Sequence, residues 1–200
     1  MSDQHARSFG DVADAYDRGR PSYPLEAAAW LVGDQPVTVL ELGAGTGKLT
    51  ATLVELGHDV HATEPDEQML ALLEQRLPEV RSSQASAEDI PAPDSSYDVV
   101  VSAQAFHWFD LDRALPEIAR VLKPGGRLAL VWNQRDERIP WVRKLGAIIG
   151  AHDQLREPAE ALADRFGVTV RTMYRDLASL RAASLTLPPH CARVSSSSRR

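Results

Sequence analysis

The sequence predicts an α/β protein with a mostly parallel sheet and helices on both faces. Five strand-like stretches alternate with helix-period stretches across residues 37–132. The first strand runs straight into a glycine-rich turn, and an amphipathic helix begins directly after it. The composition, 44% hydrophobic and 25% charged over 200 residues, is that of an ordinary globular domain with room for a sizeable core.

The first strand and its turn, from Val37 to Gly47, read V-T-V-L-E-L-G-A-G-T-G. Glycines at alternate positions let the backbone turn sharply and let a ligand approach with no Cβ in the way. The dinucleotide fingerprint G-x-G-x-x-G is not matched, because Lys48 stands where its third glycine belongs. A phosphate loop needs Ser or Thr after the lysine, and Leu49 follows instead. We therefore expect a small-molecule cradle of another kind; a tight turn without a ligand is the alternative.

The later strands also end beside polar or aromatic residues. The second, residues 59–63, ends at Glu64, where doubly wound folds use an acidic side chain to accept hydrogen bonds from ribose hydroxyls. The third, residues 80–86, leads into the loop S-A-E-D-I-P, and the fourth, residues 97–102, leads into A-Q-A-F-H-W-F. The fifth, residues 127–132, follows a Lys-Pro-Gly-Gly turn. Ligands of open α/β sheets bind beyond the carboxyl ends of the strands, so we expect one site there.

Several of these motifs, in this order, resemble those of the class I S-adenosylmethionine-dependent methyltransferases. They are E-L-G-x-G-x-G at the first strand, P-D-x-S-Y-D-V-V-V at the fourth and V-L-K-P-G-G-R-L before the fifth. The resemblance covers about residues 8–150 and is to the type 11 and ubiquinone/menaquinone methyltransferase-like members. It implies a Rossmann-like class I methyltransferase fold, S-adenosylmethionine as cofactor, and transfer of its methyl group to a small-molecule acceptor.

The resemblance also implies which residues contact the cofactor. Glu41 would hold the ammonium group through water, Glu64 the ribose, and Gln104 would close the site from the fourth strand. The glycines would pass by the amino-acid part. The implied cofactor-binding residues are Glu41, Gly43, Ala44, Gly45, Gly47, Glu64, Ala87, Glu88 and Gln104.

The adenine end of the site is implied to lie in the loop after the third strand. By position in the motif, either Glu88 or Asp89 could meet the adenine amine. We favour the Ala87 backbone together with Glu88. A polar loop without a ligand contact is the alternative.

The acceptor side is implied to lie in two other stretches. Tyr16 and Arg20 belong to the pattern F-x-x-x-A-x-x-Y-x-x-x-R-P-x-Y-P, which resembles a segment that folds over the cofactor site in many methyltransferases. Trp108 is expected to shape an apolar acceptor pocket. His107 is the candidate general base, since an imidazole has a pKa suited to proton transfer near neutral pH. A histidine that only packs between Phe106 and Trp108 is the alternative, and no metal site is predicted.

After Gly150 the chain departs from the family pattern. Family members usually continue with two more strands; here we expect none, which would leave the fifth strand as an uncovered edge. Residues 159–180 instead resemble the helix-turn-helix of deoR-type and WYL-domain regulators. Its second helix would display four side chains suited to phosphates and base edges, namely Arg171, Thr172, Tyr174 and Arg175.

The predicted organisation has four parts. They are a lid or cap segment (1–36), a cofactor-binding methyltransferase domain (37–153), a helix-turn-helix-like segment (154–183) and a disordered tail (184–200). The net charge of −6 divides into −10 for residues 1–153 and +4 for the remainder, a sign change that favours two segments with different partners.

The alternative function is a non-catalytic ligand-binding regulator that contacts DNA through residues 159–181. We regard nucleic acid binding as the less favoured outcome. The chain contains no apolar run near the roughly 20 residues that span a bilayer, no apolar signal core, and a single cysteine, Cys191. These features predict a cytoplasmic protein with no membrane partner.

Overall fold

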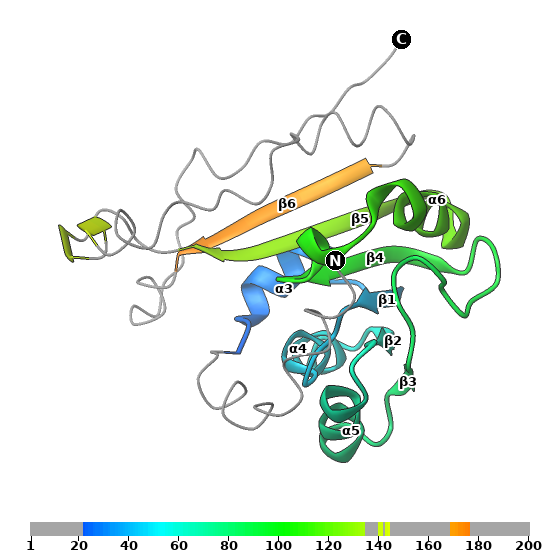
Figure 1. The fold of residues 1–200 in the computed structure, drawn as a ribbon, viewed down its shortest axis with the longest axis horizontal. Helices are drawn as coiled ribbons and strands as arrows, with labels where there is room; N and C mark the ends of the chain where they lie inside the picture. Colours follow the sequence, from blue (N-terminus) through cyan, green and yellow to red (C-terminus); the bar gives the residue numbers. More distant parts are fainter. Residues whose placement is uncertain (1–21, 135–139, 142, 145–168, 177–200) are drawn as a thin grey trace, which may run out of the picture.

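The computed structural model describes residues 22–134, 140–141, 143–144 and 169–176. Six described strands form one sheet in the order β3-β2-β1-β4-β5-β6 (Figure 1). All five pairings between neighbouring strands are parallel. The predicted α/β fold with a parallel sheet is therefore confirmed.

The elements alternate along the chain as the sequence predicts. The strands are β1 (Thr38–Leu42), β2 (Asp59–Thr63), β3 (Arg81–Ser83), β4 (Tyr97–Ala103), β5 (Leu122–Gln134) and β6 (Thr169–Asp176). The helices are α3 (Leu25–Val32), α4 (Lys48–Glu55), α5 (Glu67–Arg76) and α6 (Leu111–Val121), with a 3-10 helix η2 (Phe106–Trp108) before α6. The strand order changes direction between β1 and β4, so the carboxyl ends of these two strands flank the natural ligand crevice.

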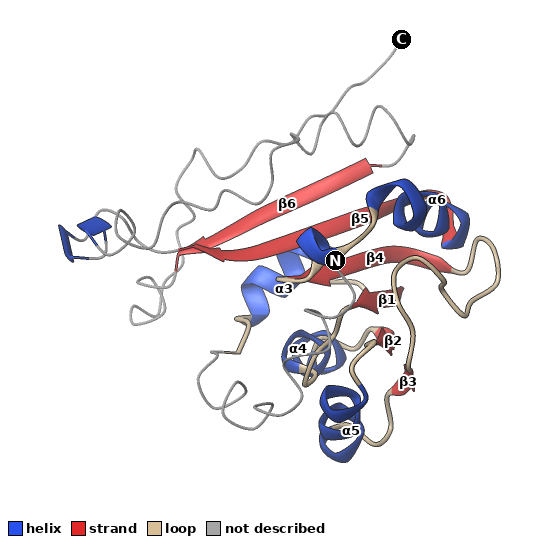
Figure 2. Ribbon diagram, viewed as in Figure 1, coloured by secondary structure: helices blue, strands red, loops and turns tan. Residues whose placement is uncertain are grey.

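Helices cover both faces of the sheet (Figure 2). On one face, α3 and α4 pack against alternate strand residues such as Val39 and Val99. On the other, α6 packs against Leu40, Val100 and Leu128. Successive strand residues point to opposite faces, so two apolar layers form from nearly continuous hydrophobic runs.

Polar contacts hold the sheet at two further places. At the amino ends of β1 and β4, the Thr38 hydroxyl and the Lys123 ammonium both donate to Asp98 Oδ2, at 2.6 and 2.9 Å. These contacts lower the pKa of Asp98 to about 2. On β2, the buried His61 ring bonds to the Tyr97 hydroxyl at 2.7 Å, and burial lowers its pKa to about 4.

The helix-turn-helix prediction is wrong where the structure describes it. Residues Thr169–Asp176 form strand β6 and pair with β5, with Thr169 opposite Arg127. Arg171, Thr172, Tyr174 and Arg175 therefore lie on a strand, not on a recognition helix. Because β6 pairs with β5, the expected uncovered edge at β5 is also wrong.

The physical reason lies in the composition of that stretch. The sequence V-T-V-R-T-M-Y is rich in β-branched and aromatic residues, which pack well on a pleated surface. Its backbone also satisfies the hydrogen-bonding groups that β5 would otherwise expose. The rest of the 159–180 stretch lies outside the described residues, as do Tyr16, Arg20 and the 184–200 tail. In the described part of the chain, no helix is long and apolar enough to cross a membrane.

Candidate functional site

An open cavity lies at the carboxyl ends of β1 and β4. It encloses about 440 Å³, part of which is open to solvent. Five of the predicted cofactor-binding residues line it: Glu41, Gly43, Ala44, Gly45 and Gln104. The other described lining residues are Tyr23, Thr46, Lys48, Leu49, Ala103 and Asn133. The cavity thus occupies the switch point of the sheet, where open α/β folds bind ligands.

The glycine turn between β1 and α4 forms one wall of the cavity. Gly43 has φ +68°, and a Cβ added there would lie 2.5 Å from the Ala105 Cβ, so only glycine fits against the turn that follows β4. Gly45 has φ +58° and presents bare backbone to the cavity. Gly47, with φ +82°, is the N-cap residue of α4, and a Cβ added there would lie 2.9 Å from the Leu73 side chain of α5.

Glu41 is a buried acid in the cavity wall. Its side chain belongs to β1, is 1% exposed, and accepts a 2.7 Å hydrogen bond from the Thr50 hydroxyl of α4. Burial raises its pKa from 4.5 to about 8; the nearby Glu64 carboxyl adds to the rise, and the Thr50 bond opposes it. Burial therefore favours the protonated carboxyl group of Glu41, and a cation beside it would favour the ionised form.

Glu64 supports the glycine turn from the end of β2. Its two carboxylate oxygens accept hydrogen bonds from the amides of Gly45 (2.8 Å) and Asp66 (3.0 Å). Burial raises its pKa, and these two backbone bonds oppose the rise. Each carboxylate oxygen can accept a second hydrogen bond, so capacity for a hydroxyl ligand is left. Glu64 is not among the described lining residues of the cavity, and its ribose contact stays a prediction.

Gln104 directly follows β4 and has an unusual backbone conformation. It is a non-glycine residue at φ +60°, and its backbone amide donates to the Val131 carbonyl at 3.0 Å. Its side-chain nitrogen is buried and has no hydrogen-bond partner among the described residues. An unpaired buried amide is unfavourable, so a ligand acceptor group in this cavity would satisfy it.

Besides Gly47 and Glu64, four predicted residues are not among the described lining residues of the cavity. Ala87 is 5% exposed and packs in the core below α6. The Glu88 carboxylate accepts a 2.8 Å hydrogen bond from the Asp110 amide. His107 and Trp108 lie in η2 with ring centroids 4.7 Å apart. The roles of all four stay predictions.

Sequence reasoning missed several lining residues. Thr46, Lys48 and Leu49 adjoin the glycines, so their presence follows from the turn itself. Asn133 lies at the carboxyl end of β5, and the rule that ligands bind at carboxyl ends of strands would have found it. Tyr23 precedes α3 and could not be placed without knowing where that helix packs.

The electrostatics of the site favour a cation over a phosphate. Glu41 and Glu64 are both buried beside the turn, while Lys48 is the one basic residue in the described lining. A pyrophosphate in the cavity would lie near the buried carboxyl group of Glu41, whereas an ammonium or sulfonium group would stabilise its ionised form. Hydroxyl groups would find acceptors on the same carboxylates.

Comparison with known proteins gives concordant results. A family model described as a methyltransferase domain matches residues 40–130. An uncharacterized methyltransferase of Mycobacterium tuberculosis is 58% identical over 143 residues, covering 72% of this chain and 59% of that protein. An uncharacterized methyltransferase of Schizosaccharomyces pombe is 40% identical over 168 residues, covering 80% and 66%. A crystal structure of an S-adenosylmethionine-dependent methyltransferase from Aquifex aeolicus, 24% identical, superposes with a TM-score of 0.54 over 60% of this chain and 71% of that one, which shows the shared fold.

The parallel sheet and the glycine-turn cavity define the class I S-adenosylmethionine-dependent methyltransferase architecture. Residues 40–130 match the methyltransferase-domain model, and the chain is similar in sequence to these methyltransferases. It spans less than two thirds of the length of these curated relatives.

Proposed function

We propose that this chain transfers the methyl group of S-adenosylmethionine to a small-molecule acceptor and holds the cofactor in the glycine-turn cavity. One observation carries the proposal. The buried acid Glu41, the bare turn at Gly43 and Gly45, and the unpaired amide of Gln104 surround a single cavity in a methyltransferase domain.

The chemistry of these groups suits each part of S-adenosylmethionine. The cofactor has a net positive charge, and the buried carboxyl of Glu41 becomes ionised more easily beside a cation. The amide of Gln104 can donate to a carboxylate oxygen. Glu64, through its remaining acceptor capacity, can bind ribose hydroxyls from beneath the turn. A dinucleotide lacks this match, because its pyrophosphate would lie near the carboxyl group of Glu41.

The cofactor supplies a methyl group on a positively charged sulfur, so an acceptor lone pair forms the new bond while the carbon–sulfur electron pair returns to sulfur. The protein has to hold the acceptor atom, the methyl carbon and the sulfur in line and to exclude water. Gly43 and Gln104 would fix the cofactor side of this line. An acceptor that loses a proton needs a base, and His107, in the 3-10 helix that follows Gln104, is the candidate.

Calorimetric titration tests the proposal directly. The purified chain is titrated with S-adenosylmethionine, S-adenosylhomocysteine and NADH. We expect saturable binding of both sulfur nucleotides, weakened in Glu64→Gln and unchanged in Glu55→Gln, an exposed carboxylate on α4 that serves as the control. Binding of NADH alone, or no binding by a folded chain, would contradict the proposal.

Methyl transfer itself needs a second assay. The chain is incubated with methyl-labelled S-adenosylmethionine and fractions of small-molecule extract. Label should appear in a small product together with S-adenosylhomocysteine. Label found only in macromolecules would contradict the proposed acceptor class.

A further inference from the structure

The loop between β3 and β4, residues 84–96, carries the predicted adenine-side residues and contains no helix. It starts at the carboxyl end of β3, where the Glu64 amide donates to the Ser83 carbonyl. It ends at Tyr97, the amino end of β4. Part of it is anchored by apolar packing, because Ala87 and Ile90 lie in the core below α6. Packing alone does not fix the direction of its backbone polar groups.

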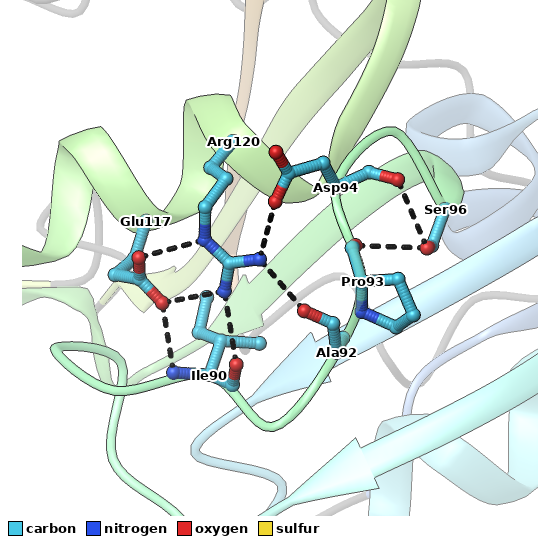
Figure 3. A network of polar contacts seen from close by, with 7 residues as sticks. All are labelled: Ile90, Ala92, Pro93, Asp94, Ser96, Glu117 and Arg120. Carbon is cyan, nitrogen blue, oxygen red and sulfur yellow. Dashed lines mark hydrogen bonds and ion pairs between the residues drawn. The ribbon is translucent and has the colours of Figure 1, made fainter.

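Arg120, in the last turn of α6, binds the backbone of this loop (Figure 3). Its guanidinium donates to the carbonyls of Ile90 (3.0 Å) and Ala92 (2.7 Å). Two further bonds join Arg120 to Glu117, at 2.8 and 2.7 Å, and one joins it to Asp94 at 2.9 Å. Glu117 also accepts from the Ile90 amide at 3.1 Å, so the pair satisfies both polar groups of that residue. A planar guanidinium with five donors is suited to this arrangement, whereas an ammonium is not.

A second contact ties the start of α6 to the same loop. The Glu88 carboxylate accepts a hydrogen bond from the Asp110 amide, just before α6. Near the other end, the Ser96 amide donates to the Val121 carbonyl at 2.8 Å. The loop is therefore bonded to α6 along the length of the helix. Because η2 leads into α6, these bonds also connect the loop to the segment after Gln104.

The individual contacts differ in weight. The Asp94 side chain is 76% exposed, so its ion pair with Arg120 contributes little. Arg120 and Glu117 are only 31% and 24% exposed, and the charged bonds to backbone groups are shorter and stronger than neutral ones. The two bonds from Arg120 to the carbonyls of Ile90 and Ala92 therefore contribute most to holding the loop.

We propose that Arg120, braced by Glu117, is a positioning residue for adenine recognition: it holds the 87–92 backbone so that the loop reads the adenine amine, without touching the cofactor. This inference rests on the proposed function. It predicts that loss of Arg120 reduces the part of the affinity that depends on the adenine amine and leaves the rest of the binding in place.

The test compares two ligands, S-adenosylhomocysteine and S-inosylhomocysteine, in which a carbonyl oxygen replaces the adenine amine. We expect the wild-type chain to prefer S-adenosylhomocysteine by up to roughly tenfold, the worth of one hydrogen bond. Arg120→Ala should abolish most of this preference, and Arg120→Lys should restore little of it. Arg113→Ala, an exposed arginine on the same helix, is the matched control and should keep the preference.

The ratio of the two affinities is insensitive to partial unfolding, because an unfolded fraction lowers the apparent affinity for both ligands by the same factor. Amide hydrogen exchange gives a ligand-free check: Ile90 should exchange faster in Arg120→Ala and Arg120→Lys, while Val100 in β4 should not. An unchanged preference in these variants, or no preference in the wild type, would overturn the inference and leave the proposed function standing. Absence of S-adenosylhomocysteine binding in the wild type would overturn both.

Discussion

Replacing Glu41 with glutamine should stabilise the protein at neutral pH while harming the cofactor site. In the folded chain burial raises the pKa of Glu41 to about 8, against an ordinary value of 4.5. Between these two values the folded state holds a proton that the unfolded state has lost, so the free energy of unfolding falls as the pH rises. At about 1.36 kcal/mol per pH unit, the loss between pH 5 and pH 7.5 is about 3 kcal/mol. Glutamine has the same shape, can still accept the Thr50 hydroxyl, and has no proton to lose.

The assay is urea denaturation of wild type and Glu41→Gln at both pH values. The stability advantage of the variant should grow by about 3 kcal/mol from pH 5 to pH 7.5. Glu55→Gln, an exposed carboxylate, should show no such growth. An advantage that is the same at both pH values would refute the reasoning, because it would mean that Glu41 is already ionised in the folded chain.

Three further predictions concern other parts of the fold. Gly43→Ala, where a Cβ would lie 2.5 Å from that of Ala105, should lower the free energy of unfolding by about 2 to 4 kcal/mol. Gly57→Ala, with φ +84° but nothing within 4 Å of the added Cβ, should lower it by only about 1 kcal/mol. Equal losses in the two variants would contradict the close contact at Gly43. Asp98→Asn should lower the free energy of unfolding by about 1 kcal/mol at neutral pH, a value discounted for the exposure of the side chain. This difference from wild type should vanish as the pH falls from 3.8 to about 2, where the wild-type carboxylate takes up its proton. A difference that persists at pH 2 would contradict the reasoning. The NMR signal of His61 should not titrate between pH 8 and pH 5, since its pKa is lowered to about 4; a midpoint near 6.5 would contradict its burial.

The strands near the ligand crevice could be predicted because their local signals agree. β1, β2 and β4 are short, buried, apolar runs bounded by turns, and their observed bounds agree with the predicted ones within a residue. β5 begins at Leu122, earlier than the predicted residue 127, because Leu122 pairs with Tyr97 across an irregular register. That pairing depends on a long-range contact, which a local pattern does not contain.

The same limit explains the errors at the site and at the C-terminus. The motif located the loop of Glu88 but not the direction of its side chain, which is set by an amide 22 residues away. In the stretch that forms β6, the helix-turn-helix resemblance outweighed the β-branched composition, and only the neighbouring β5 decides between the two. Gln104 was predicted as a cofactor contact, but its positive φ and its unpaired amide are visible only in three dimensions.

The most direct test of the central claim is an NMR titration of the isotope-labelled chain with S-adenosylhomocysteine, read at assigned backbone amides. The cavity at the glycine turn is the proposed cofactor site, so the amides of Gly43, Gly45 and Gln104 should shift in a saturable way with one common dissociation constant. Gly125, in the irregular first part of β5 at the amino ends of the strands, should not move. Saturable shifts confined to other regions, or no shifts in a folded chain, would contradict the account.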